Sequence, residues 1–524
     1  MKQGLAIDKI NIESEIKSSI TQKFQDILFN VDFLSDCAPL LIFVIGGILT
    51  LLVGALTANK ERFSFIAFLI ALMTAFASSL KAILSLNTSE ASTMLGQSIL
   101  RDEISTLSYA VISFITLFTL VFSSFTHNGK KLLRYEMLTL FLFCSFGLMV
   151  MISAGEFATF FIGLEISSLS LYVLVGYQRK SVKALEAAIK YFILGGASAA
   201  MILIGAAFIY SSLGSLTWAS LSFISLTYDN PLSVLGVIFF LSGLCFKIGL
   251  APFHSWAPDV YQGANSHLTA FMASTVKYAV AIVFLRLLSI LPESYGSKSL
   301  LIVFWIIALL SITIGSLFGM VQESVKRILA YSSIANAGYL CIAFATLARH
   351  PESLFSKQTL VSYAIIYAIL SLVSFTIVAW IENGQEEDLQ KDELIGLGHY
   401  NKFTAVAFSF LLIALAGLPP FAGFVGKYML LVTALKNNLI GLAVILIMFS
   451  VFTFVYYISI ISKIWFVPKS TPISRPIQNE NEFAYRLLLV FCILLILAIG
   501  IIGPKWAFHL SYVQGFENSI RMLP

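Results

Sequence analysis

Long apolar segments recur along almost the whole chain, and they constrain the fold more than any other feature. Runs of about twenty residues with few charges repeat from Ala38 to Gly503, and about twenty apolar residues are what an α-helix needs to cross a bilayer. Only 12% of the 524 residues are charged, against about 25% in a typical soluble domain. The sequence therefore predicts an all-α polytopic membrane protein and excludes a soluble enzyme.

Fourteen transmembrane helices are predicted. They lie near residues 38–57, 63–86, 104–125, 132–153, 156–177, 187–211, 232–252, 267–290, 299–320, 326–347, 359–381, 403–434, 439–464 and 483–503. Residues 1–36 form an N-terminal extension whose apolar residues are spaced for an amphipathic helix, with a loosely ordered tail as the alternative. Residues 37–131 hold helices 1–3, and residues 467–524 hold helix 14 and a C-terminal tail.

The loops between the spans predict how the chain is oriented. Connections after odd-numbered spans hold sixteen Lys and Arg residues, whereas connections after even-numbered spans hold five. The positive-inside rule places the basic loops in the cytoplasm, so both termini are expected on the periplasmic side. The loop of residues 382–393 is acidic instead. We predict that it is a solvated connector, with a cation site as the minor alternative.

Two predicted spans contain proline inside or at the end of an apolar run. Pro252 lies at the end of span seven, and Pro419 and Pro420 lie within span twelve. Proline removes a backbone donor and clashes with the preceding turn, so helices 7 and 12 are predicted to be broken, with a simple packing kink as the alternative. Interrupted helices in corresponding positions indicate inverted repeats. Because the breaks lie five spans apart, residues 132–298 (helices 4–8) and 299–466 (helices 9–13) are predicted to be two inverted five-helix repeats.

Four ionisable residues lie deep inside predicted spans, where a charge costs roughly 3 kcal/mol on insertion scales. They are Glu165 in span five, Lys247 near the break of span seven, Lys277 in span eight and Lys427 in span twelve. Burial disfavours a charged lysine and a nearby carboxylate favours it, so a lysine can take up and release a proton, whereas arginine stays protonated. We therefore expect these residues to carry protons. The structural alternatives are local hydrogen bonding of Glu165 and snorkelling of Lys427 to the interface.

Weaker signals come from residues near the ends of the spans. Lys190 follows Glu186 at i,i+4 spacing and is expected to form a surface pair, with a cytoplasmic gate as the minor alternative. His254 and His267 flank the connection between spans seven and eight and are expected to be structural, with a proton relay as the alternative. Arg286, near the outer end of span eight, is expected to snorkel. No nucleotide motif and no His or Cys metal spacing occurs, so we expect no cofactor or metal site in this chain.

Four stretches resemble the antiporter-like subunits of respiratory complex I, which is NADH–quinone oxidoreductase. They are residues 190–199 (KYFILGGASA), 246–264 (FKIGLAPFHSWAPDVYQGA), 326–339 (KRILAYSSIANAGY) and 417–427 (GLPPFAGFVGK). The run Asp259-Val-Tyr-Gln-Gly and the lysine at position 427 are similar to the subunit N branch of that family, rather than to subunits L or M. The resemblance covers about residues 38–505.

The resemblance implies fourteen helices, two inverted repeats and proton translocation driven by electron transfer elsewhere in the complex. It implies that Glu165 tunes Lys247, that Lys277 bridges the two repeats and that Lys427 lies nearest the outer exit. NADH, FMN, iron–sulfur clusters and quinone are then expected in partner subunits. The expected partners are antiporter-like subunit M, small membrane subunits and the lipid bilayer, with no nucleic acid. The expected location is a bacterial inner (plasma) membrane, with a plastid as the minor alternative, because mitochondrial forms lack the first helices.

Two departures limit what the resemblance carries. The family continues after the Asp-Val-Tyr motif with Ala-Pro-Thr-Pro, whereas this chain has Ala264-Asn-Ser-His, so His267 becomes a candidate for proton uptake. Residues 1–36 exceed the usual family pattern, and no role is carried over to them. Two alternatives stay open: a subunit of a multisubunit cation/proton antiporter, and a membrane scaffold that carries no protons.

Overall fold

Thirteen helices of the described chain are long and apolar enough to cross a membrane. The computed structural model describes residues 37–56, 61–86, 92–94, 98–130, 132–224, 230–291, 297–382, 385, 388–466 and 482–504. The predicted N-terminal helix, the C-terminal tail beyond residue 504 and part of the acidic loop lie outside the described residues. Helices α18 and α19 fall within the predicted twelfth span, and each is too short to cross a membrane alone.

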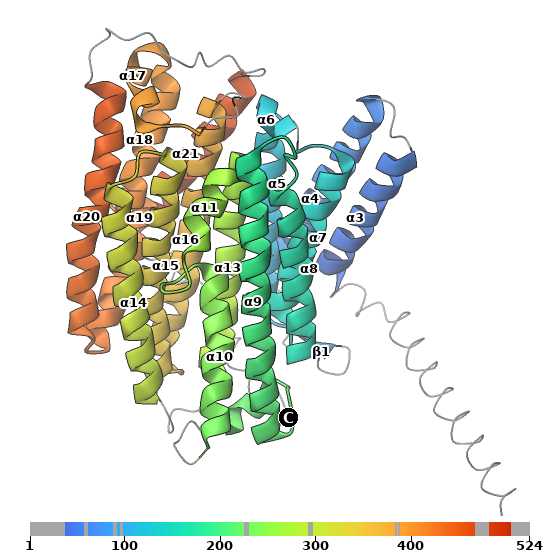
Figure 1. Ribbon diagram of the computed structural model, residues 1–524, viewed down its shortest axis with the longest axis vertical. Helices are drawn as coiled ribbons and strands as arrows, with labels where there is room; N and C mark the ends of the chain where they lie inside the picture. Colours follow the sequence, from blue (N-terminus) through green and yellow to red (C-terminus); the bar gives the residue numbers. More distant parts are fainter. Residues whose placement is uncertain are drawn as a thin grey trace, which may run out of the picture.

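The helices run side by side, with α3 and α4 at one end of the bundle and α20 at the other (Figure 1). The long helices are α3 (Ala38–Leu56), α4 (Glu61–Ser85), α5 (Glu103–Ser123), α7 (Tyr135–Ser153), α8 (Phe157–Val175), α9 (Val182–Leu213), α10 (Pro231–Ile248), α13 (Lys277–Ile290), α14 (Ser297–Met320), α15 (Val325–Arg349), α16 (Leu354–Glu382), α18 (Lys402–Ala416), α19 (Ala422–Lys436), α20 (Ile440–Trp465) and α21 (Glu482–Ile502). Short helical elements are α6 (His127–Lys130), η1 (Ala219–Phe223), α11 (Trp256–Gly263), α12 (Ser266–Phe271), the π-helical turn η2 (Met272–Val276), η3 (Lys391–Leu394) and α17 (Leu397–Tyr400).

A small departure from the all-α prediction lies between α4 and α5. Strands β1 (Ser92–Met94) and β2 (Ile99–Arg101) form a short antiparallel pair. Asp102 follows β2 directly and caps α5, because its side chain accepts a hydrogen bond from the backbone N–H of Ser105. Carboxylates are favoured at this position, since the first turn of a helix has unpaired N–H groups.

Both helices in which the sequence predicted a break are interrupted. Helix α10 ends at Ile248 and α11 begins only at Trp256, while α18 ends at Ala416 and α19 begins at Ala422. Each of α10 and α18 ends on a left-handed glycine, Gly249 with φ +77° and Gly417 with φ +86°. Glycine alone adopts this conformation without a steric cost from a Cβ atom. Carbonyl groups at both breaks are thereby freed from regular helix hydrogen bonds.

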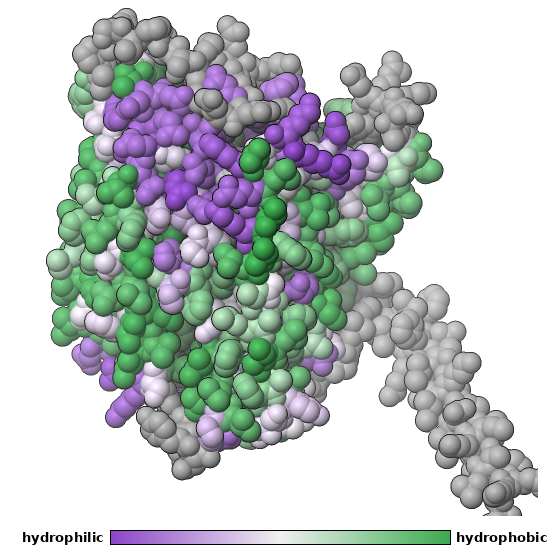
Figure 2. Space-filling view, in the orientation of Figure 1, coloured by the Kyte–Doolittle hydropathy of each residue, from purple (hydrophilic) through white to green (hydrophobic). Residues whose placement is uncertain are grey.

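The core of the bundle lies around the continuous segment α12–η2–α13 and the helices α15 and α16. Every residue in the most apolar stretch of residues 266–290 is buried. In the corresponding stretch of α21, only 22% of the residues are buried. Helices α9 and α20 expose apolar side chains at the outside, such as Phe192, Ile193 and Val451. Figure 2 shows a broad hydrophobic band with hydrophilic residues gathered above it. We call this upper end, which carries α6, α17 and the loop of residues 176–181, the basic face.

Candidate functional site

Lys247 lies at the end of α10 and points toward α8, the helix that carries Glu165. Its ammonium donates hydrogen bonds to Ser168 Oγ at 2.8 Å and to the Tyr172 hydroxyl at 3.4 Å. Glu165, Ser168 and Tyr172 follow one face of α8, because positions i, i+3 and i+7 of a helix align. Glu165 is half-buried at the middle of α8, and its Oε1 accepts no hydrogen bond from the described residues. No ion pair within 4 Å joins the described residues Glu165 and Lys247, and Lys247 is held by hydroxyl groups instead.

Lys277 is the most deeply buried of the three lysines, with 1% of its surface exposed. Its ammonium donates to the backbone carbonyl of Ser333 on α15 at 2.9 Å and also contacts the Ser333 hydroxyl. It lies near the broken end of α10 as well, because a Cβ atom added at Gly249 would be 3.9 Å from Lys277 Nζ. The π-helical turn η2 directly precedes Lys277, and such turns are frequent at functional sites.

Lys427 is held by the second break. Its ammonium donates to the carbonyl of Ala416, the last residue of α18, at 2.8 Å and lies 5.0 Å from the centre of the Tyr339 ring. A cation at the carboxyl end of a helix is favourably placed, because unpaired carbonyls gather there. Only 7% of Lys427 is exposed. The alternative that Lys427 snorkels to the interface is therefore wrong.

Polar side chains connect the surroundings of Lys277 and Lys427. Ser332 directly precedes Ser333, the partner of Lys277, and contacts the Tyr457 hydroxyl. Asn336 donates to the Ser332 carbonyl at 2.8 Å and accepts from the Tyr363 hydroxyl at 2.7 Å. The Tyr363 ring in turn packs against Gly426, beside Lys427. These hydroxyl and amide groups were not predicted, because Ser, Asn and Tyr are common in transmembrane helices and carry no charge.

Lys190 forms the predicted surface pair and a second one. Its ammonium lies 2.7 Å from Glu186 Oε1 and 2.8 Å from Asp259 Oδ2, and 41% of the side chain is exposed. Asp259 also accepts a hydrogen bond from Arg327 at 2.8 Å. Burial raises the pKa of Asp259, but the hydrogen bonds and charges of Lys190 and Arg327 outweigh it and hold the pKa below its ordinary value. The pair predicted from spacing is confirmed, and Asp259 extends it.

The two histidines lie in different surroundings. His254 lies half-buried in the non-helical segment between α10 and α11, and its Nδ1 has no hydrogen-bond partner among the described residues. His267 is fully buried in the first turn of α12, where Nε2 shares a hydrogen bond of 2.7 Å with the Thr126 hydroxyl. Its Nδ1 also finds no partner in the described part of the chain. His267 therefore contacts the residue that directly precedes α6 at the basic face.

Arg286 does not snorkel, and this prediction is wrong. It is buried, and its guanidinium forms two hydrogen bonds of 2.8 and 2.7 Å with the Asp102 carboxylate at the start of α5. Burial raises the pKa of Asp102, but the charge and hydrogen bonds of Arg286 and the hydrogen bonds of Ser105 hold it below the ordinary value of 3.8. The partners lie 184 residues apart, so no local pattern could have joined them.

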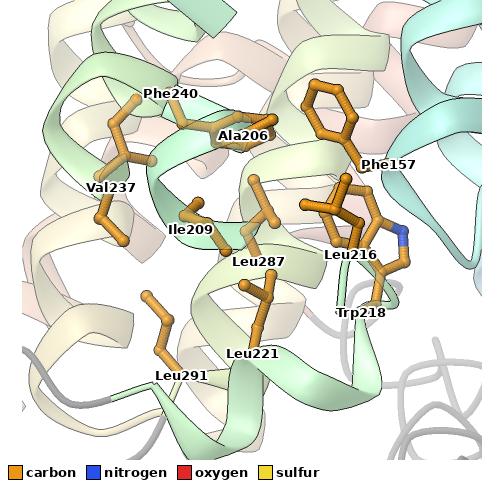
Figure 3. A pocket seen from close by; sticks show the side chains of 11 residues that line it. Phe157, Ala206, Ile209, Leu216, Trp218, Leu221, Val237, Phe240, Leu287 and Leu291 are labelled. Carbon is orange, nitrogen blue, oxygen red and sulfur yellow. The ribbon is translucent and has the colours of Figure 1, made fainter. Parts of the chain in front are cut away.

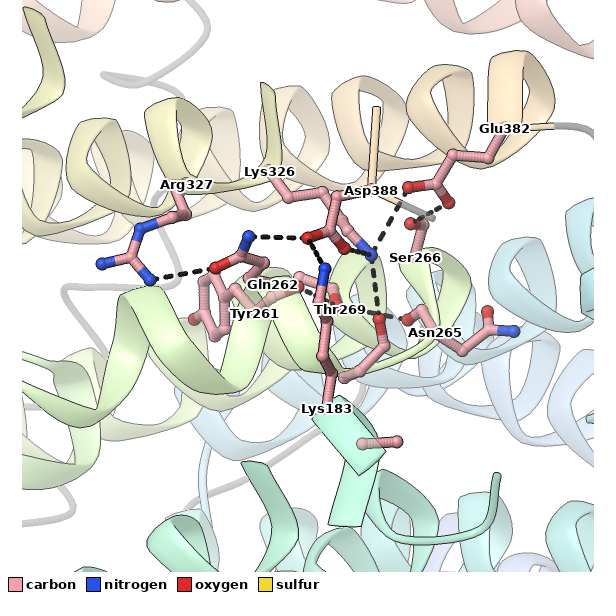
Figure 4. Close-up of polar contacts among 12 residues, drawn as sticks. Lys183, Tyr261, Gln262, Asn265, Ser266, Thr269, Lys326, Arg327, Glu382 and Asp388 are labelled. Carbon is pink, nitrogen blue, oxygen red and sulfur yellow. Dashed lines mark hydrogen bonds and ion pairs between the residues drawn. The ribbon is translucent and has the colours of Figure 1, made fainter. Parts of the chain in front are cut away.

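The acidic loop is not simply a solvated connector. Glu382 and Asp388 are both 5% exposed, and both lie within 4 Å of the ammonium of Lys326, which is also buried. Figure 4 shows these three side chains converging beside Ser266 and Gln262. Among the described residues of the loop, the prediction fits Gln385, which is exposed, and Asp392, whose side chain is 72% exposed.

An apolar cavity lies at the end of the bundle opposite the basic face, and its lining contains no charged side chain. It is lined by eleven residues, ten of which Figure 3 labels, among them Phe157, Trp218 and Phe240. Its volume of about 30 Å³ matches roughly one water molecule. The indole N–H of Trp218 is already bonded to the Ala154 carbonyl at 2.5 Å. The candidate site is therefore the row of buried lysines.

A multi-pass bundle with broken helices and lysines buried at mid-membrane is the architecture of an ion-translocating membrane subunit. A family profile described as "NADH:quinone oxidoreductase/Mrp antiporter, TM" matches residues 154–453, which is more than half of the chain. The chain belongs to this family.

The similarity to individual relatives narrows the assignment within this family. NADH-quinone oxidoreductase subunit N 1 of Thermodesulfovibrio yellowstonii is 35% identical over 375 residues, covering 71% of this chain and 78% of that protein. A subunit in the structure of respiratory complex I from Thermus thermophilus with bound Aureothin superposes with a TM-score of 0.74 at 27% identity, covering 90% of this chain and 98% of that one. A chain of the Mrp complex from Dietzia sp. DQ12-45-1b reaches a TM-score of 0.78 at 20% identity, with 93% and 97% covered, which shows a shared fold alone.

Proposed function

We propose that the chain is a proton-translocating membrane-arm subunit of NADH–quinone oxidoreductase. Protons move along Glu165, Lys247, Lys277 and Lys427, and electron transfer in partner subunits drives them. The observation that carries the proposal is the way in which the three lysines are held. Each buried ammonium donates to a hydroxyl or carbonyl oxygen, and all three lysines lie at or beside the broken end of a helix.

Such an arrangement suits a group that must change its protonation state. A neutral oxygen stabilises a buried ammonium, yet it also tolerates the neutral amine when the proton leaves. A neighbouring carboxylate such as Glu165 shifts this balance when its own charge changes. The polar groups between Ser333 and Tyr363 supply donors and acceptors for the lateral step from Lys277 toward Lys427. Lys190, His254 and His267 are secondary candidates near the cytoplasmic side.

The surroundings of the chain follow from the same proposal. NADH, FMN, iron–sulfur clusters and quinone lie in partner subunits, and the direct neighbours are subunit M, small membrane subunits and lipid. The basic face lies in the cytoplasm, and both termini lie on the periplasmic side of a bacterial inner membrane. Residues 132–298 and 299–466 form the two inverted repeats, whose breaks at Gly249 and Gly417 correspond.

The test is proton pumping by membrane vesicles that contain the assembled complex. Lys247→Ala is expected to abolish pumping, and Lys427→Ala to impair it. Lys427→Arg should restore little, because arginine keeps its proton. Pumping at the native number of protons per NADH in Lys247→Ala would overturn the proposal. Normal pumping by the double variant Glu165→Gln, Lys277→Ala would instead indicate a scaffold.

The antiporter alternative makes a different prediction. A subunit of a cation/proton antiporter would support growth at alkaline pH in sodium, and its deletion would abolish that growth. The similarity to the Mrp chain shows fold alone, whereas the sequence similarity to subunit N reaches 35% over 71% of this chain. We therefore favour complex I.

A further inference from the structure

Two buried carboxylates share one buried lysine at the basic face. Lys326 Nζ lies 3.4 Å from Glu382 Oε1 and 3.7 Å from Asp388 Oδ1. All three side chains are at most 7% exposed. Figure 4 shows that they come from the start of α15, the end of α16 and the loop that follows α16. We call Lys326, Glu382 and Asp388 the acidic cluster.

The acidic cluster places two buried carboxylates around one buried ammonium. Asp388 has a second cationic neighbour, Lys183 at 3.0 Å, but the side chain of Lys183 is 61% exposed. Water screens such an exposed charge strongly, whereas Lys326 is as buried as the two carboxylates that share it. The cluster therefore gathers two groups that can bind a proton at one buried site.

Glu382 is the member best placed to accept that proton. Its Oε2 accepts a hydrogen bond from the Ser266 hydroxyl at 2.5 Å. Its Oε1 is buried and accepts no hydrogen bond from the described residues, although it lies near Lys326. Asp388, by contrast, accepts hydrogen bonds from both Lys183 and Gln262. A proton on Glu382 Oε1 displaces no hydrogen bond of the described residues, but it ends the ion pair with Lys326 and leaves Asp388 as the carboxylate partner of that lysine.

Two adjoining cavities lead from the basic face to the acidic cluster. The outer cavity has a volume of about 210 Å³ and a charged rim that includes Glu186, Lys190, Asp259 and Arg327. The inner cavity, of about 30 Å³, borders all three members of the acidic cluster together with Ser266. Both are lined by Lys183, Gln262 and Gly263. The inner cavity is polar and large enough for a water molecule, so water can carry a proton to Glu382.

The acidic cluster is also connected to the buried pathway through two helices. Ser266 begins α12, and Lys277 follows eleven residues later on the continuous segment. Lys326 lies in the first turn of α15, and Ser333 follows seven residues later. A spacing of seven returns to the same face of a helix, so Lys326 and Ser333 share one face of α15 at an axial distance of about 10 Å. Because Lys277 binds Ser333, both helices lead from the acidic cluster to the same lysine.

We propose that the acidic cluster is the site at which the chain takes up protons from the cytoplasm for Lys277, with Glu382 as the proton acceptor. A proton from water in the inner cavity binds Glu382 Oε1 and forms the neutral acid. The acid then releases the proton toward the neutral amine of Lys277 and returns to the carboxylate. The inference rests on the proposed function, and it adds residues that are remote from the row of buried lysines.

The test uses the purified whole complex in detergent, where no gradient opposes turnover. Glu382→Gln keeps the shape of the side chain and removes the proton site, so we expect NADH–quinone turnover to slow at least threefold. Addition of formate should restore a large part of the lost rate, because a small weak acid can carry protons into the cavity. Glu382→Asp should retain more than half of the native rate. Glu323→Gln is the matched control, since Glu323 is also paired with a buried lysine, Lys391 at 3.3 Å, but its side chain is 66% exposed and lies outside the acidic cluster.

Each outcome decides the inference. Native turnover in Glu382→Gln overturns it, and so does a slow variant that formate leaves unchanged, because that result indicates a structural role. If Glu382→Gln does not assemble, Asp388→Asn, which leaves the Lys326–Glu382 pair in place, is measured in the same way and should show the same slowing and rescue. Lys277→Ala separates this inference from the proposed function. Loss of pumping in Lys277→Ala with native turnover in Glu382→Gln refutes the inference alone.

Discussion

Gly417, the left-handed residue at the end of α18, offers a way to move Lys427 without removing its charge. A Cβ atom added at Gly417 would lie 2.7 Å from Lys427 Cδ and 3.4 Å from its Nζ. The first distance is too short for a carbon–carbon contact, so Gly417→Ala must displace the lysine side chain. Alanine in the left-handed conformation, here at φ +86°, adds about 1–2 kcal/mol of backbone strain.

The displacement changes how the lysine is held. The ammonium would lose its 2.8 Å hydrogen bond to the Ala416 carbonyl, and a hydrogen bond to a charged group contributes about 1.5–3 kcal/mol. Since about 1.4 kcal/mol is a factor of ten, the equilibrium between the held and the released ammonium shifts roughly ten- to a hundredfold. We expect the number of protons pumped per NADH to fall clearly below the native value.

Gly214→Ala is the matched control. Gly214 is also left-handed, with φ +69°, and a Cβ atom there would meet nothing within 4 Å. It therefore carries the same backbone strain and displaces no lysine. Both variants are measured in inside-out vesicles, with dye quenching for pumping and NADH oxidation for turnover. Equal pumping by the two variants would refute the argument that Lys427 acts from its position at the break.

Three further predictions concern residues that support the fold or the pathway. Ser333→Ala removes the hydroxyl that contacts Lys277 and should lower pumping in vesicles while the complex assembles normally. Asp102→Asn leaves Arg286 with a neutral partner and should cost about 3–5 kcal/mol in thermal unfolding of the purified complex. Asp102→Leu combined with Arg286→Met should cost only the lost cap of α5, about 0.5–2 kcal/mol. Because the pKa of Asp102 lies below 3.8, the native pair should stabilise at all pH values above about 4. That stabilisation should disappear only in stronger acid, a loss that Asp102→Asn cannot show.

The sequence predicted the features that depend on local composition. A charge within twenty apolar residues is conspicuous, so Glu165, Lys247, Lys277 and Lys427 could be identified directly. Proline and glycine mark the breaks, because their backbone preferences act over a few residues. The same reasoning predicted the orientation of the loops, which stays a prediction.

The sequence did not predict the features that depend on contacts between distant segments. Arg286 near a helix end looks like a snorkelling residue, and only the fold shows Asp102 beside it. Glu382 and Asp388 lie in an acidic loop, which composition alone reads as solvated. Hydropathy describes a segment and not its neighbours, so it cannot show that this loop folds over Lys326.

The described charges of the bundle differ in whether their partner is itself charged. This difference determines which of them can gain or lose a proton. Arg286 is bound by both oxygens of a buried carboxylate, and removing a charge from such a pair leaves its partner uncompensated. Lys247 and Lys427 instead donate to hydroxyl and carbonyl oxygens, so the departure of a proton from either leaves only a neutral acceptor behind. Glu382 stands between these cases, since its carboxylate shares Lys326 with Asp388. Charges that hold the helices together are therefore paired, whereas the three buried lysines proposed to carry protons are held by groups that bear no charge.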